Sequence, residues 1–109
     1  MSKGAFRSTQ DVMIQVPDMK RALEFYTKVM GLKLREENER YACVDTGAFP
    51  LFIEKGGEPG AVFEFLVDDL EAAKARLLAA GCSVVEEDPK LPRLYLRDPY
   101  GLTFNLGRR

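Results

Sequence analysis

The stretch Arg93-Leu-Tyr-Leu-Arg-Asp-Pro-Tyr-Gly-Leu-Thr-Phe-Asn-Leu106 holds two alternating runs on either side of Asp98-Pro-Tyr-Gly101. Asp, Pro and Gly occupy the positions that they prefer in a type I turn. Successive side chains of a strand point to opposite faces, so each run has an apolar side and a polar side. The stretch therefore predicts a β-hairpin with one face in a core and one face open for function. The core face comprises Leu94, Leu96, Leu102, Phe104 and Leu106, and the open face comprises Arg93, Tyr95, Arg97, Thr103 and Asn105.

Composition limits the class of protein. The 109 residues suffice for one domain with a core, and 46% apolar with 30% charged residues is ordinary for a globular protein. A net charge of −1 with interspersed signs argues against a nucleic-acid or anionic membrane partner. No apolar stretch approaches the length of a membrane span, and the N-terminus lacks a hydrophobic leader. Cys43 and Cys82 are too few for a disulfide framework, so we expect a reduced, cytoplasmic protein.

The chain contains no histidine. This excludes Ser-His-Asp and Cys-His nucleophile pairs, histidine general bases and every imidazole metal site. Any proton transfer would therefore depend on a carboxylate, a tyrosine, a lysine or a cysteine.

The pattern of residues 11–55 predicts a strand, a helix and three further strands. Residues 11–16 alternate as a half-buried strand does, and Asp18 is placed to cap a helix that reaches Met30 before Gly31 ends it. Three short strands are expected at about residues 32–37, 40–45 and 50–54. Residues 1–10 are expected to precede the domain as an irregular extension.

Residues 61–107 repeat this order. A strand at 61–67 leads to a helix that Asp68-Asp-Leu-Glu71 opens with the spacing of a capping box, and a strand near 83–87 precedes the closing hairpin. An offset of 51 aligns Val16-Pro-Asp18 with Val67-Asp-Asp69, Asp11 with Val62, and Glu54 with Asn105. This indicates internal duplication. We therefore predict one α+β domain over residues 11–109, made of two tandem βαβββ repeats (about 11–55 and 61–107). Their strands would form a curved, cup-shaped mixed sheet with the helices on its outer face.

Two motifs resemble signatures of the vicinal oxygen chelate superfamily. Val16-Pro-Asp-Met19 with Phe25-Tyr-Thr-Lys-Val-Met-Gly-Leu-Lys-Leu34 resembles its first-helix signature, and Asp98-Pro-Tyr-Gly-Leu-Thr-Phe-Asn-Leu106 resembles its closing signature. That superfamily includes glyoxalase I, the bleomycin resistance proteins, extradiol dioxygenases and fosfomycin-resistance transferases. The resemblance runs from about Asp11 to Leu106 and implies the duplicated fold. It says less about activity, because this fold hosts several chemistries.

Metal-dependent members of this family carry four ligand positions, commonly His or Gln, Glu, His and Glu. The resemblance places these positions at Asp11, Glu54, Val62 and Asn105. Only Glu54 has the usual ligand type, since Val62 cannot coordinate a metal and Asn105 offers one neutral oxygen. This set is poor for Zn or Ni and marginal for Mg or Mn. We therefore expect no metal and no other cofactor, and without a Lewis acid the family's isomerisation and ring-cleavage chemistry loses its catalyst.

Several residues allow both a functional and a structural interpretation. Glu54 is the best candidate for a catalytic residue, as a general base with a raised pKa, but it could equally be a solvated charge or the partner of Arg97. Arg97 could hold a ligand carboxylate or phosphate, or form a surface ion pair. Tyr95 and Phe52 could stack on a planar ligand or pack on the sheet. Glu64 places a charge in the middle of a strand, which is unusual unless a basic side chain lies close to it.

Strand alternation places one set of side chains on the open face. The set comprises Asp11, Met13, Gln15, Phe52, Glu54, Glu64, Tyr95, Arg97, Thr103 and Asn105. This set contains aromatic rings, one cation, three carboxylates and several neutral polar groups. Such a set suits a polar, partly aromatic or cationic small molecule.

Three functions remain open from the sequence. The first, which we favour, is a metal-free small-molecule-binding protein of the glyoxalase/bleomycin-resistance type with a concave sheet pocket. The second is a glyoxalase- or dioxygenase-like lyase, isomerase or oxidoreductase with an altered metal site, or an enzyme that uses a carboxylate base. The third is a regulatory or scaffold module. We also expect a homodimer in which two open sheets face each other, because Met13, Phe52 and Leu66 would otherwise meet water.

Overall fold

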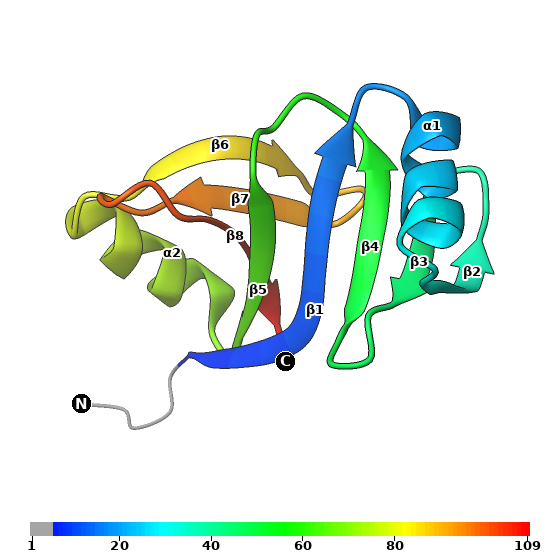
Figure 1. Ribbon diagram of the computed structural model, residues 1–109. Helices are drawn as coiled ribbons and strands as arrows, with labels where there is room; N and C mark the ends of the chain where they lie inside the picture. Colours follow the sequence, from blue (N-terminus) through cyan, green and yellow to red (C-terminus); the bar gives the residue numbers. More distant parts are fainter. Residues whose placement is uncertain (1–5) are drawn as a thin grey trace. The chain divides into compact units, whose positions relative to one another are not determined.

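The computed structural model describes residues 6–109. They form two compact units: residues 10–61, here called the N-terminal unit, and residues 62–109 with residues 6–9, here called the C-terminal unit. The element order is strand, helix and three strands, and then the same again (Figure 1). The predicted fold class, α+β with two tandem βαβββ repeats, is confirmed.

The N-terminal unit has the strand order β2-β3-β4-β1 (Figure 1). β1 pairs in parallel with β4, while β3 runs antiparallel to both β2 and β4. The helical segment between β1 and β2 lies against this sheet through its contacts with β4. The bounds are Arg7–Val16 for β1, Lys33–Glu37 for β2, Tyr41–Asp45 for β3 and Pro50–Lys55 for β4.

The helical segment starts where the sequence predicts but changes its winding. Asp18 caps it, because its side chain accepts a hydrogen bond from the backbone N–H of Arg21 at 3.1 Å. The prediction of one α-helix to Met30 is wrong, because α1 (Met19–Glu24) continues as a π-helix, η1 (Phe25–Val29). The Thr27 hydroxyl donates to the Leu23 carbonyl at 2.7 Å. It thereby competes for the acceptor that the α-helical Thr27 N–H would use.

The core of the N-terminal unit lies between this helical segment and one face of the sheet. Val44, Leu51 and Ile53 are its buried centre. Alternate residues in the second half of β1 and several helix residues pack around them: Val12, Ile14, Val16, Met19, Ala22, Leu23 and Tyr26. The opposite face of β1 and β4 is therefore the open face, as strand alternation predicts.

The C-terminal unit has the strand order β5-β8-β7-β6, with α2 packed against β8. β5 pairs in parallel with β8, and β7 runs antiparallel to both β8 and β6. The bounds are Ala61–Val67 for β5, Leu70–Ala79 for α2, Ser83–Asp88 for β6, Arg93–Arg97 for β7 and Thr103–Arg108 for β8.

The cap of α2 lies one residue later than predicted. Asp69, not Asp68, is the N-cap, and it accepts a hydrogen bond from the N–H of Ala72 at 3.1 Å. The third helical position is therefore Ala72 rather than Glu71, so no carboxylate can complete a capping box. Gly81 ends the helix with φ +107°, and a Cβ there would lie 3.2 Å from Pro99 Cγ. Glycine therefore allows the positive φ at this position and leaves room for Pro99 of the closing hairpin.

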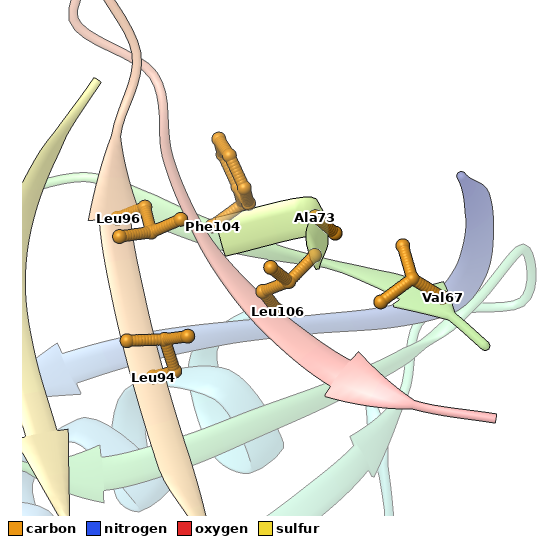
Figure 2. Close-up of a cluster of buried hydrophobic side chains, with 6 residues drawn as sticks. All are labelled: Val67, Ala73, Leu94, Leu96, Phe104 and Leu106. Atoms are coloured by element: carbon orange, nitrogen blue, oxygen red, sulfur yellow. The ribbon is translucent and has the colours of Figure 1, made fainter. Parts of the chain in front are cut away.

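The core of the C-terminal unit confirms the predicted apolar face of the closing hairpin except at Leu102, which precedes β8 and is 36% exposed. Figure 2 shows Leu94 and Leu96 on β7 beside Phe104 and Leu106 on β8, together with side chains from β5 and α2. The ring of Phe65 packs against Phe104 edge to face, with centroids 5.3 Å apart. Such pairs add to the stability that area burial gives.

The turn of the closing hairpin forms as predicted. The N–H of Gly101 donates to the carbonyl of Asp98 at 3.2 Å, and Gly101 has φ +98°. The Asp98 carboxylate accepts hydrogen bonds from the N–H groups of Tyr100 and Leu102 at 2.8 and 2.9 Å. One side chain therefore holds the whole turn.

The N-terminal boundary differs from the prediction. β1 begins at Arg7, so part of the expected extension 1–10 belongs to a strand, and residues 1–5 lie outside the described residues. Phe6 packs against the core of the C-terminal unit, with the Arg76 guanidinium 5.9 Å from its ring centroid. Among the described residues, no helix combines the length and the apolar character that crossing a membrane requires.

Candidate functional site

The open face of the N-terminal unit presents aromatic, amide and carboxylate side chains from neighbouring strands. In the register of β1 and β4, Met13 lies opposite Phe52 and Gln15 lies opposite Glu54. Tyr41 of β3 lies opposite Glu54, and its ring packs against Phe52 with centroids 5.6 Å apart. Tyr41 is not among the predicted site residues, although alternation along β3 places it on this face.

Gln15 connects Glu54 to the loop that follows β4. Its Nε2 donates to Glu54 Oε1 at 3.1 Å, and its Oε1 accepts from the N–H of Glu58 at 2.8 Å. A Cβ at Gly56 would collide with the Gln15 side chain, so glycine leaves room for this arrangement. The Glu54 carboxylate is therefore oriented by a neighbouring amide on a regular strand.

Cys43 lies opposite Phe52 on the same face and is 4% exposed. Burial raises the pKa of the Cys43 thiol; Arg35 opposes this shift, and the carboxylates of Glu36 and Asp11 add to it. Because the thiolate is the nucleophilic form, Cys43 is a poor nucleophile at neutral pH. Cys43 therefore acts as a small buried apolar residue, as buried free cysteines usually do.

The open face of the C-terminal unit is organised around Asn105. Its Nδ2 donates to Glu64 Oε2 at 3.1 Å, and its Oδ1 accepts from the N–H of Leu94 at 3.0 Å. Both ends of the amide are used, so the backbone of β7 fixes the side chain that in turn holds Glu64. The mid-strand position of Glu64 predicted a basic partner, whereas the structure places the neutral amide of Asn105 beside it.

Tyr95 is less accessible than an aromatic ring that stacks on a ligand should be. It is 2% exposed, and the Arg93 guanidinium lies 4.6 Å from its ring centroid. Arg93 also pairs with Glu86 of the neighbouring strand at 3.5 Å. A ligand approaching that side of the ring would meet Arg93 first, and neither Arg93 nor Glu86 was among the predicted site residues.

Arg97 and Thr103 form the remaining polar pair of this face. They lie opposite each other in the register of β7 and β8, and Arg97 Nε donates to Thr103 Oγ1 at 3.2 Å. Thr103 is 4% exposed. This pair sits next to the turn, and the hydrogen bond directs the Arg97 guanidinium toward β8.

The predicted site residues thus divide into two groups, each gathered on the open face of its own unit. The N-terminal unit holds Asp11, Met13, Gln15, Phe52 and Glu54, and the C-terminal unit holds Glu64, Tyr95, Arg97, Thr103 and Asn105.

The register corrects the alignment of Glu54 with Asn105. Met13 and Glu64 are equivalent at the offset of 51, and they lie opposite Phe52 and Asn105, respectively. Asn105 therefore corresponds to Phe52, and Glu54 corresponds to Gly107, which lies opposite Leu66. The cause is loop length: the connections β2–β3 and β3–β4 have three and four residues, whereas β6–β7 and β7–β8 have four and five.

The four family ligand positions do not fit a metal ion. Glu54 lies opposite Gln15, four residues along β1 from Asp11, which is about 13 Å at a rise of ~3.3 Å per residue. Metal–oxygen bonds of about 2.0–2.6 Å hold two ligand oxygens within about 5 Å of each other, so both side chains would have to extend along the sheet toward one another to share an ion. Asn105 already uses both ends of its amide, and Val62 is a hydrocarbon. Residues 6–109 contain no group of three or more Cys, Asp or Glu side chains placed to hold a metal ion.

The misfit leads to a prediction about metal binding. Purified protein should contain sub-stoichiometric metal, and added Zn, Ni, Mn or Fe should not raise its melting temperature specifically, because tight binding to the folded state would stabilise it by mass action. Elemental analysis and thermal melts with each metal measure this. Stoichiometric metal that survives dialysis and is lost in Glu54→Ala would contradict the prediction.

Comparison with known proteins agrees with the motif resemblance. Residues 9–106 match the family model "Glyoxalase/Bleomycin resistance protein/Dioxygenase superfamily". The chain is similar to the structure of a superfamily member from Vibrio splendidus 12B01 (16% identity, TM-score 0.65, 95% of this chain and 99% of that one). It is also similar to an extradiol ring-cleaving dioxygenase from B. fuscum (20% identity, TM-score 0.54, 88% of this chain and 30% of that one). These likenesses concern the fold alone. A comparison with the curated proteins finds no match.

Proposed function

Because this chain belongs to the glyoxalase/bleomycin resistance protein/dioxygenase superfamily, we propose that it binds a small organic molecule on its open sheet faces without a metal. The ligand is polar, partly aromatic or cationic. One observation carries the proposal: the Glu64 carboxylate on the open face of β5 is held by the amide of Asn105, which is itself held by the N–H of Leu94.

This arrangement favours a ligand with a cationic or hydrogen-bond-donating group. The side chain that holds Glu64 is a neutral amide rather than a cation, because Asn105 Nδ2 donates to Glu64 Oε2. A carboxylate has about four acceptor positions, and Asn105 uses one of them. Charge-assisted hydrogen bonds to an ammonium or N–H group are about twice as strong as neutral ones. In the N-terminal unit, Gln15 orients the Glu54 carboxylate in a similar way.

The test is a thermal-shift screen of thiol conjugates, aromatic diols and antibiotics, with and without an amino group, followed by calorimetry on any compound that stabilises the protein. We expect the hits to contain a cationic or donor group, and Glu64→Gln and Glu54→Gln to weaken them at least tenfold without lowering the melting temperature of the free protein.

The matched control is Glu39→Gln, which changes an exposed carboxylate in the β2–β3 loop and should leave affinity unchanged. Equal affinity of Glu64→Gln and wild-type protein for every hit would contradict the proposal. Turnover of a thiol conjugate or an aromatic diol would favour the enzymatic alternative instead.

We further propose that the protein acts as a cytoplasmic homodimer. Cys43 and Cys82 are both free thiols, which supports a reducing compartment. The apolar residues that the sequence analysis gave as the reason for pairing, Met13, Phe52 and Leu66, are partly buried. More strongly exposed apolar side chains lie elsewhere, on the helical segment of the N-terminal unit.

A further inference from the structure

Two aromatic rings meet at an angle on the open face of the N-terminal unit. Tyr41 comes from β3 and Phe52 from β4, and their ring centroids lie 5.6 Å apart with the ring planes at 68°. Both side chains are partly exposed. Rings inclined in this way form two walls of a corner, whereas stacked rings would present a single face. A compact group that enters the corner therefore touches the faces of both rings.

A carboxylate is hydrogen-bonded to one wall of this corner. The Tyr41 hydroxyl donates to Glu36 Oε2 at 3.0 Å. Glu36 belongs to the edge strand β2 and lies opposite Cys43, which places it on the open face. A phenol that donates to a carboxylate gains electron density, so the face of its ring attracts a positive charge more strongly. Tyr41 is therefore a better wall for a cation than a tyrosine with a solvated hydroxyl.

A second carboxylate adjoins the ring pair from β4. Glu54 lies opposite Tyr41 in the register and two residues after Phe52, on the same face. Its Oε1 accepts a hydrogen bond from Gln15 Nε2 at 3.1 Å, so a neutral amide orients it. Carboxylates from β2 and from β4 thus flank the rings. Negative charge beside two ring faces is complementary to a cation and repels an anion.

The Cys43 thiol, which lies opposite Phe52, senses the charges around this corner. Burial is the largest cause of its raised pKa. Among the charged groups, Arg35 lowers the pKa of Cys43, and the carboxylates of Glu36, Asp11 and Asp45 raise it. One guanidinium is therefore set against three carboxylates in the field that acts on this part of the open face.

Two other aromatic rings of the chain already hold a cation. The Arg76 guanidinium lies 5.9 Å from the ring centroid of Phe6, and the Arg93 guanidinium lies 4.6 Å from that of Tyr95. Within residues 6–109, no such contact involves either ring of the corner. A cationic ligand therefore reaches these two ring faces without displacing a guanidinium of the chain.

We propose that Tyr41, Phe52 and Glu36 form a binding site for an alkylated ammonium group, such as a trimethylammonium. The site rests on the proposed function and narrows its ligand to a cation with methyl groups in place of N–H donors. Methyl groups fill the corner and carry the positive charge against both ring faces. A primary ammonium is more strongly hydrated and loses more on leaving water for an aromatic corner.

The first test compares three probes by NMR titration of isotope-labelled wild-type protein. The probes are choline, its uncharged isostere dimethylbutanol, in which carbon replaces nitrogen, and ethanolamine, which keeps the charge without the methyl groups. Choline should bind about tenfold more tightly than either, because only choline combines the charge with the methyl surface. The largest shift changes should fall on amide groups of β3 and β4.

This comparison needs no variant and can overturn the site by itself. Equal binding of choline and dimethylbutanol would show an apolar surface without cation recognition. Tighter binding of ethanolamine would show a carboxylate that prefers N–H donors to methyl groups. Choline that fails to saturate the protein at tens of millimolar would also overturn the site.

The second test removes the walls of the corner one at a time. Tyr41→Leu and Phe52→Leu keep an apolar side chain but lose the ring, so each should weaken choline about fivefold or more and narrow its advantage over dimethylbutanol. Glu36→Gln keeps an acceptor for the Tyr41 hydroxyl but loses the charge, and should weaken choline about threefold. The matched control is Tyr100→Leu in the closing turn, where the ring is 94% exposed, and it should leave choline binding unchanged.

Melting curves identify the variants that remain folded. An unchanged advantage of choline over dimethylbutanol in folded Tyr41→Leu and Phe52→Leu would overturn the site.

The site and the proposed function fail in different ways. If Glu64→Gln leaves every compound of the thermal-shift screen unaffected while choline keeps its advantage in wild-type protein, the contact proposed at Glu64 is wrong and the site stands. If Tyr41→Leu and Phe52→Leu leave choline unaffected while Glu64→Gln weakens the screened compounds, the site is wrong and the proposed function stands.

Discussion

Phe104→Ala is expected to lower the free energy of unfolding by about 3–5 kcal/mol, as truncation of a buried aromatic side chain does. Phe104 is 5% exposed, belongs to the C-terminal core drawn in Figure 2 and packs edge to face against Phe65. Removing the ring loses its burial and leaves a cavity between β8 and α2. Urea denaturation followed by circular dichroism measures the change.

Two variants control this result. Phe63→Ala removes the same kind of ring from the neighbouring strand β5, where Phe63 lies opposite Phe104. Phe63 is 37% exposed, so its loss should lower the stability by clearly less. Asn105→Ala leaves the N–H of Leu94 without its side-chain acceptor, which should cost about 1–3 kcal/mol. If Phe104→Ala left stability unchanged while Asn105→Ala unfolded the protein, the two faces of the hairpin would be assigned wrongly.

The assignment of faces was predictable because it depends on a local rule. Alternation along each strand places Leu94 and Leu96 in the core and Asn105 on the open face without any knowledge of the neighbouring strands. The turn was predictable for the same reason, since Asp98 and Gly101 act within five residues of each other.

The partners of the site residues were not predictable from the sequence. Glu64 and Asn105 meet only because β5 and β8 pair in parallel with a particular register, and they are separated by 41 positions in the chain. A constant repeat offset gave the wrong equivalence for Glu54, because each connection of the second repeat adds its own change in length. The register of two strands is set by the turns and by the packing of the whole sheet, so the pattern of residues along one strand does not predict it.

The winding of the helical segment shows a second limit. The apolar spacing from Met19 to Met30 fits an α-helix, but the Thr27 hydroxyl takes the Leu23 carbonyl and the segment widens into a π-helix. A hydrogen bond from a side chain to the backbone does not change the spacing of the apolar residues, so that spacing cannot reveal it. Phe25, Val29 and Met30 in this part of the segment are exposed.

Ile53→Ala is expected to lower the free energy of unfolding by about 2–5 kcal/mol. Ile53 is fully buried in the N-terminal core, where β4 meets β1 and the helical segment. Its truncation removes apolar area and leaves a cavity that close-packed neighbours cannot fill. The graded variant Ile53→Val removes one methylene and should cost only about 0.5–1.5 kcal/mol.

Leu34→Ala is the control for this series. Leu34 lies on edge strand β2 of the same unit and is 40% exposed, so its truncation should cost less than that of Ile53. Urea denaturation of the three variants should rank Ile53→Ala as the most destabilised. If Leu34→Ala and Ile53→Ala were equally destabilising, the N-terminal core would have to extend to the edge strand. Because Leu34 lies opposite the core residue Val44, such an extension would follow the core face and leave the Gln15–Glu54 pair on the open face.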